Sequence, residues 1–129
     1  MLNRDRLTLA VVDDDEDVRS ALDRLLRSMG HEVHVFPTAE AFDAGATVID
    51  CLILDVRLPG LSGIELCELI RLRGSLLPIV LITGNSDPSP CDGLRTIGDI
   101  NALPLMKPFS DEDLMDAINR AVSAAHHAR

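Results

Sequence analysis

Apolar residues along the chain follow two different spacings. Short apolar runs occupy Leu7–Val12, Cys51–Leu54 and Pro78–Ile82, a pattern typical of strands that are buried on both faces of a parallel sheet. Glu32–Phe36 alternates apolar and polar residues, and Leu103–Met106 is a weaker apolar run. The pattern therefore predicts five strands.

Helical spacing of apolar residues follows most of these strands. The first helix is expected to end at Gly30, and a second, short helix to begin at Pro37-Thr38. Later helices are expected to begin with capping boxes, in which two side chains bond each other's backbone N–H groups. These boxes pair Ser62 with Glu65, in a helix running to about Arg73, and Ser110 with Asp113.

Alternating strands and helices, with no internal repeat or linker in 129 residues, predict one α/β domain with helices on both faces of the sheet. In such a three-layer sandwich, chemistry gathers at the carboxyl ends of the strands. The residues expected there are Asp13, Asp14, Asp55, Thr83 and Lys107.

Composition excludes several classes of protein. The net charge is −9, the basic residues are scattered, and neither Trp nor Tyr is present, so nucleic-acid binding is not expected. No apolar run is long enough to span a membrane, and the first residues lack a signal-peptide cleavage pattern. Cys51, Cys67 and Cys91 form no C-x-x-C motif. We expect small core cysteines in a reducing cytoplasm.

Crowded carboxylates are the unusual feature of the predicted site. Asp13, Asp14 and Asp55 would repel one another in one pocket, but together they suit a hard divalent cation such as Mg²⁺. Asp15–Asp17 are better explained as a solvated helix N-terminus. Lys107 is the one lysine among 12 basic residues, and a compact ammonium suits a crowded phosphate site.

Four motifs in order, VVDDD, LILDVRLPGLSG, LITG and MKPF, resemble the receiver domain of two-component response regulators. The variety is the one that precedes LuxR-like helix-turn-helix modules in nitrogen-fixation regulators. The resemblance implies one receiver domain over residues 1–129, with a flavodoxin-like parallel sheet in the order 2-1-3-4-5.

The resemblance also implies a phosphoacceptor, Asp55, which takes a phosphoryl group from a sensor histidine kinase or a histidine phosphotransfer protein. Mg²⁺ would be bound by Asp14, Asp55 and the backbone carbonyl of Arg57, with Asp13 acting through water.

Phosphate contacts are implied for three further residues. Thr83 would donate its hydroxyl, Gly84 would leave room for the phosphate, and Lys107 would supply charge. A cis bond between Lys107 and Pro108 is usual in the family. Such a protein is a signalling phosphoacceptor rather than an enzyme, assisting only its own phosphorylation and dephosphorylation.

Pro104 departs from the family, which usually has Tyr or Phe at this switch position. A receiver-like scaffold that binds its partner without phosphorylation is therefore a second hypothesis. An aspartate-based phosphatase of the haloacid-dehalogenase type is a third, although it would need a second Asp where Arg57 stands.

Partners and surroundings are less defined by the sequence. The downstream protein target is unknown, homodimerisation stays open, and the chain is expected to be either a single-domain regulator or a truncated one. His31 and His34 should lie on opposite sides of a strand as surface residues, and His126-His127 should be tail residues near a helix end.

Residues 85–101 are rich in residues that interrupt helices. Pro88, Pro90, Gly93 and Gly98 interrupt any helix there, so phosphorylation is expected to order this segment instead of moving an aromatic ring. Hydrogen exchange with and without a phosphate mimic should show increased protection in 85–101. Unchanged protection there, with increases elsewhere on the surface, would show that the switch lies in another element.

Overall fold

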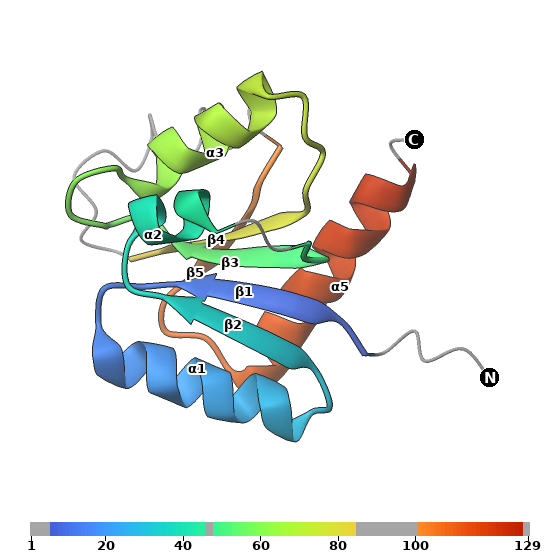
Figure 1. Ribbon diagram of the computed structural model, residues 1–129. Helices are drawn as coiled ribbons and strands as arrows, with labels where there is room; N and C mark the ends of the chain where they lie inside the picture. Colours follow the sequence, from blue (N-terminus) through green and yellow to red (C-terminus); the bar gives the residue numbers. More distant parts are fainter. Residues whose placement is uncertain (1–5, 46–47, 85–100, 128–129) are drawn as a thin grey trace.

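The computed structural model describes residues 6–45, 48–84 and 101–127. One parallel sheet in the order β2-β1-β3-β4-β5 forms its centre (Figure 1), which confirms the predicted topology. The strands are β1 (Thr8–Val12), β2 (Glu32–Phe36), β3 (Cys51–Asp55), β4 (Ile79–Thr83) and β5 (Leu103–Met106). The helices are α1 (Glu16–Ser28), α2 (Ala39–Ala44), α3 (Gly63–Leu72) and α5 (Asp111–His127).

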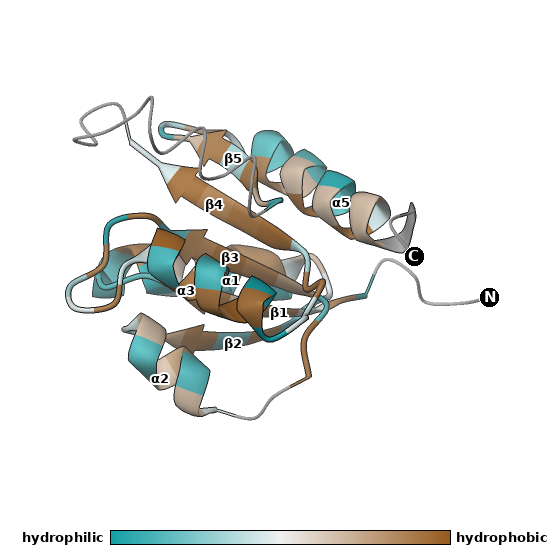
Figure 2. Cartoon of the chain, turned by 90° about the horizontal axis from the view of Figure 1, so that it is seen from above, coloured by the Kyte–Doolittle hydropathy of each residue, from teal (hydrophilic) through white to brown (hydrophobic). Residues whose placement is uncertain are grey.

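Two hydrophobic layers cover the two faces of the sheet. Ala10, Leu52 and Leu54 belong to the layer beneath α2 and α3. The residues that alternate with them along the strands, such as Val11 and Ile53, belong to the layer beneath α1 and α5. Figure 2 shows apolar strands between helices that also carry polar residues. The structure is therefore the expected three-layer sandwich.

Strand register brings the strand ends to one edge of the sheet. Val12 at the end of β1 pairs with Leu54 of β3, so Asp13 and Asp55 follow side by side. Thr83 at the end of β4 pairs with Met106, which places Lys107 just beyond it. This edge contains all the strand-end residues that the sequence analysis selected.

The structure confirms most of the predicted helix and strand ends to within about one residue. Both capping boxes form, with reciprocal bonds between Ser62 and Glu65 and between Ser110 and Asp113. Thr38 caps α2. The first strand begins at Thr8 rather than Leu7, and α3 ends at Leu72, because helix and strand ends are set by hydrogen bonds that periodicity does not resolve.

His31 corrects one expectation. It is only 7% exposed, and its Nδ1 accepts a hydrogen bond from the Leu7 backbone N–H at 3.0 Å. It lies in the connection to β2, where the chain packs beside the start of β1, so it is not a surface residue. His34, by contrast, is partly exposed and contacts Glu32.

Cysteines in the described residues are buried free thiols, as expected for Cys51 and Cys67. Burial raises the pKa of each thiol to about 12. Cys91 and most of the 85–101 segment lie outside the described residues, as do the side chains of His126 and His127.

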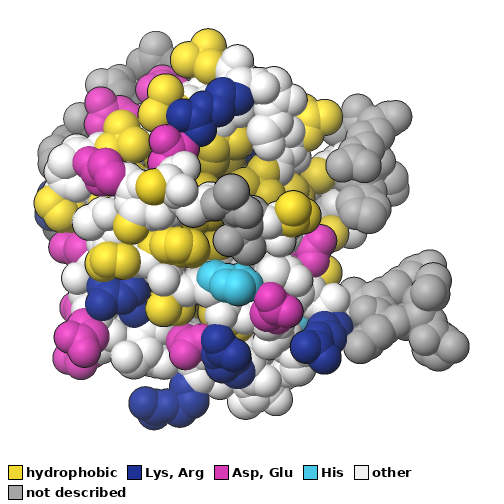
Figure 3. Space-filling model, in the orientation of Figure 1, with side chains coloured by type: hydrophobic (Ala, Val, Ile, Leu, Met, Phe, Trp, Pro, Cys, Tyr) yellow, Lys and Arg dark blue, Asp and Glu magenta, His cyan; other side chains and the backbone are white. Residues whose placement is uncertain are grey.

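Surface charge is mixed on the face shown in Figure 3, where basic and acidic side chains are interspersed. Within residues 6–45, 48–84 and 101–127, no helix is both long and apolar enough to cross a bilayer.

Gly63 supplies a prediction about the junction between β3 and α3. A Cβ at this position would collide with the Asp55 carbonyl oxygen, whereas a Cβ at Gly45 would meet only ordinary contacts of 3.6 Å or more. Gly63→Ala should therefore destabilise the fold by about 1–3 kcal/mol through overpacking. Gly45→Ala is the control and should be neutral or slightly stabilising. Urea denaturation of both variants checks this, and equal midpoints would contradict the close packing.

Candidate functional site

Three carboxylates converge at the carboxyl edge of the sheet. Asp13 and Asp55 are buried, with exposed fractions of 2% and 7%, while the neighbouring Asp14 is exposed. One carboxylate oxygen from each of the three residues lies within 4.8 Å of the other two. The structure thus brings together the acids that the sequence selected.

Backbone N–H groups hold one oxygen of each buried carboxylate. Asp13 Oδ1 accepts from the N–H of Asp15, and Asp55 Oδ1 accepts from the N–H of Arg57, both at 2.9 Å. These turns leave the Oδ2 atoms for other partners. Among the described residues, Asp13 Oδ2 is buried without a hydrogen-bond partner, which is costly unless a cation or water binds it.

Burial raises the pKa of Asp13 to about 6. The bond from Asp15 acts in the opposite direction. The negative charge of Asp55 raises the pKa further, as does the hydrogen bond that a protonated Asp13 makes to Asp55. Lys107 lowers it by a smaller amount. At neutral pH Asp13 is therefore ionised at an energetic cost.

Oxygen donors make the acidic pocket suitable for a hard cation. Asp13, Asp14 and Asp55 offer only carboxylate oxygens, the ligands that Mg²⁺ prefers. The unpartnered oxygen of Asp13 shows that the protein's own groups do not complete the pocket. The residues present therefore fit a divalent cation.

Lys107 approaches the acids from the end of β5. Its Nζ lies 3.4 Å from Asp55 Oδ2, and its backbone N–H donates to the Thr83 carbonyl at 2.8 Å. The bond between Lys107 and Pro108 is cis, as expected. Thr83 and Gly84 are partly buried beside this connection, so the backbone of β4 ends next to the strand that carries the ammonium.

Pro104 lies in β5, at the edge of the sheet, in register with Leu81. It is exposed. An edge strand tolerates proline because the missing N–H need not pair with another strand. Position 104 therefore has no aromatic side chain that could rotate between two conformations.

Arg19 is a site residue that the sequence analysis missed. Its Nη1 donates to the Asp13 backbone carbonyl at 2.8 Å, which fixes the turn between β1 and α1. The side chain of Asp15 caps α1 through the N–H groups of Asp17 and Val18, as expected for a solvated helix start. The spacing of Arg19 matched no motif, so only the folded turn reveals its contact.

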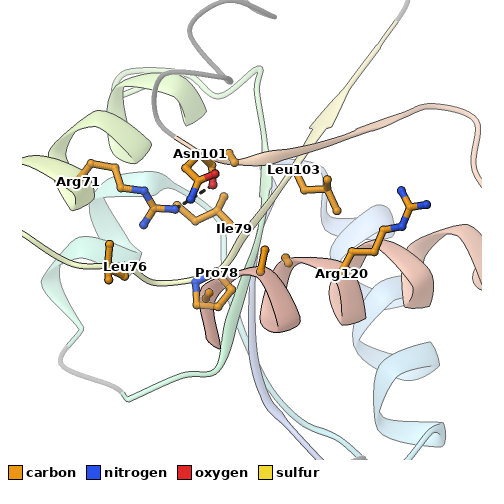
Figure 4. Close-up of a pocket in the computed structure, with 11 residues that line it drawn as sticks. Arg71, Leu76, Pro78, Ile79, Asn101, Leu103 and Arg120 are labelled. Atoms are coloured by element: carbon orange, nitrogen blue, oxygen red, sulfur yellow. Dashed lines mark hydrogen bonds between the residues drawn. The ribbon is translucent and has the colours of Figure 1, made fainter. Parts of the chain in front are cut away.

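A hollow lies beside the start of β4, at the ends of the strands opposite to the acidic cluster (Figure 4). It has a volume of about 90 Å³, and its lining includes Arg71, Leu103 and Arg120. Arg71 donates to the backbone carbonyls of Ser75 and Asn101. This hollow is separate from the acidic site.

Sheet order and strand-end acids together define a flavodoxin-like α/β domain with an acidic cluster at the carboxyl ends of its strands. The response regulator receiver domain family matches residues 9–119. Response regulator protein TmoT of Ectopseudomonas mendocina is 38% identical over 127 residues, covering 96% of this chain and 56% of TmoT.

Transcriptional regulatory protein FixJ of Bradyrhizobium diazoefficiens is 38% identical over 120 residues, covering 92% of this chain and 58% of FixJ. The solved structure of response regulator StyR has a TM-score of 0.80 at 38% identity, covering 95% of this chain and 62% of that one. The chain belongs to the response regulator receiver domain family. It spans about half the length of the curated relatives it matches.

Asp13→Asn tests the electrostatic cost of the pocket. A raised pKa means that the folded state favours protonated Asp13, so the wild type loses stability as pH rises from 3.8 through about 6. Without divalent cations at neutral pH, the variant should be more stable by roughly 1–3 kcal/mol. The difference should disappear below about pH 4.

Urea denaturation across this pH range is the measurement. The control is Asp50→Asn, at an exposed position just before β3, where asparagine retains an oxygen acceptor for the Thr8 N–H. This variant should change stability by less than about 0.5 kcal/mol. A variant that is less stable than the wild type at neutral pH would show that the ionised carboxylate is not a cost.

Proposed function

We propose that Asp55 accepts a phosphoryl group from the phosphohistidine of a sensor kinase or a histidine phosphotransfer protein. The main support is the environment of its carboxylate. The group is buried, its Oδ1 accepts from the Arg57 N–H, and its Oδ2 lies 3.4 Å from Lys107 Nζ. Family membership supports a phosphoacceptor role in two-component signalling.

Mg²⁺ is the cation that we propose for the pocket. Asp14, Asp55 and the backbone carbonyl of Arg57 would hold it, with Asp13 acting through water. When bound, the ion neutralises the acids and the incoming phosphoryl oxygens. The converging carboxylates and the unpartnered Asp13 oxygen support this assignment.

Phosphoryl transfer needs little covalent chemistry from the protein beyond Asp55 itself. A carboxylate oxygen of Asp55 bonds to phosphorus while the phosphorus–nitrogen bond of the donor breaks, and the electron pair leaves with the imidazole. Lys107 would exchange its contact with Asp55 for a phosphoryl oxygen, and Thr83 would donate its hydroxyl. Gly84 would leave room for the phosphate.

The output is proposed to be a change in a surface that binds a downstream protein, with a homodimer as one form. The protein would act as a switch and would assist only its own phosphorylation and dephosphorylation. We propose that the protein acts in the cytoplasm. The free thiols of Cys51 and Cys67 support a reducing compartment.

A scaffold that binds its partner independently of phosphorylation is the second candidate function. Pro104 favours it, because this exposed position in an edge strand lacks an aromatic side chain that could rotate in response to Thr83. The two candidates differ in whether Asp55 accepts phosphorus.

Acetyl phosphate with Mg²⁺ separates them. Intact mass spectrometry should show one added phosphoryl group, which hydroxylamine removes because the product is an acyl phosphate. Asp55→Asn should abolish the addition, and Asp50→Asn, just before the start of the same strand, should retain it. A wild type that stays unmodified would favour the scaffold.

A further inference from the structure

Glu40 of α2 contacts the loop that leads from β3 to α3. Its Oε2 accepts a hydrogen bond from the Leu61 backbone N–H at 3.0 Å, across 21 positions of sequence. In Figure 1 this green loop passes beside α2. The contact joins a helix that contributes no residue to the acidic pocket with the loop that follows Asp55.

Gly60 provides the space for this carboxylate. Its φ of +72° is one that residues with side chains rarely adopt, and an added Cβ would lie 2.6 Å from Glu40 Oε2. The loop backbone therefore receives the carboxylate closely at Gly60 and Leu61. Both the conformation and the close approach depend on glycine.

Other contacts hold the two ends of the same loop. The Val56 N–H donates to the Ile82 carbonyl, and the Val56 carbonyl accepts from the Gly63 N–H. Leu58 is buried in the core beneath α2 and α3. Glu40 thus restrains the outer part of a loop whose ends are already fixed.

Arg57 lies inside this restrained loop. Its backbone N–H holds Asp55 Oδ1 at 2.9 Å, and its carbonyl is one of the proposed cation ligands. We infer that Glu40 is a positioning residue for the cation site, which acts by holding the Arg57 backbone in place through Leu61. This inference rests on the proposed function.

Ordering the loop before the cation arrives would remove part of the entropic cost of binding. Groups that orient metal ligands without touching the metal typically change its affinity 10–100-fold when they are removed. We expect an effect in the lower part of this range for Glu40, because its contact with Leu61 reaches the Arg57 backbone only through residues 58–61.

Asp43 offers a matched control on the same short helix. It pairs through both carboxylate oxygens with Arg73, the C-cap residue of α3, and this contact lowers the pKa of Asp43. Asp43→Ala therefore removes a charged contact between α2 and α3 without touching Gly60 or Leu61. Glu40→Gln retains an oxygen acceptor for the Leu61 N–H and serves as the conservative variant.

The first measurement is amide hydrogen exchange by NMR in the absence of divalent cations. Glu40→Ala should speed exchange of the Leu61 N–H, while Asp43→Ala and Glu40→Gln should leave it close to wild type. The second is calorimetric titration with MgCl₂. Glu40→Ala should weaken Mg²⁺ binding roughly tenfold, with the other two variants close to wild type.

Each alternative outcome has a distinct meaning. Equal losses of Mg²⁺ affinity in Glu40→Ala and Asp43→Ala would show a general effect of α2 packing and would overturn the inference. Faster Leu61 exchange with unchanged Mg²⁺ affinity would also overturn the positioning role. A wild type that binds no Mg²⁺ would remove the proposed function as well, whereas normal binding and phosphorylation in both the wild type and Glu40→Ala would remove this inference alone.

Discussion

Two carboxylates buried at the ends of adjacent strands impose the constraint on which the site depends. Burial, together with the charge of Asp55, raises the pKa of Asp13 to about 6. At neutral pH Asp13 therefore carries a negative charge in a buried position that disfavours it. The backbone N–H groups of Asp15 and Arg57 offset part of this cost. Lys107 offsets another part from the end of β5, and a bound cation would offset the rest.

The hydrophobic layers keep this arrangement rigid. All five residues of β3 are buried, so Asp55 cannot move into water without disturbing packing on both faces of the sheet. Gly63 lets α3 begin against the Asp55 backbone, and β5 ends at Met106, in register with Thr83. The acids are therefore held at fixed separations by parts of the chain that carry no charge.

Periodicity and strand-end logic were sufficient to predict a parallel sheet, most helix boundaries and the convergence of Asp13, Asp14 and Asp55, because these features depend on local patterns repeated along the chain. The order of the strands came from the resemblance to receiver domains. The contacts of Arg19 and Glu40 were not predictable. Each joins a side chain to backbone atoms of a turn or loop. Unlike the capping boxes, these contacts follow no fixed sequence spacing, so residue type alone does not indicate them. The expectation that His31 lies on the surface was wrong for a similar reason. Its burial depends on the backbone N–H of Leu7, which donates to its ring at the entry to the sheet.

Lys107 is the one lysine of the sequence, and its side chain is 44% exposed although it contacts Asp55. Among side chains, amine-selective chemistry has a single target in this protein, and that target belongs to the site itself. The reactivity of one ammonium is thus a native reporter for the occupancy of the pocket, because any ligand that engages Lys107 changes its access to reagents.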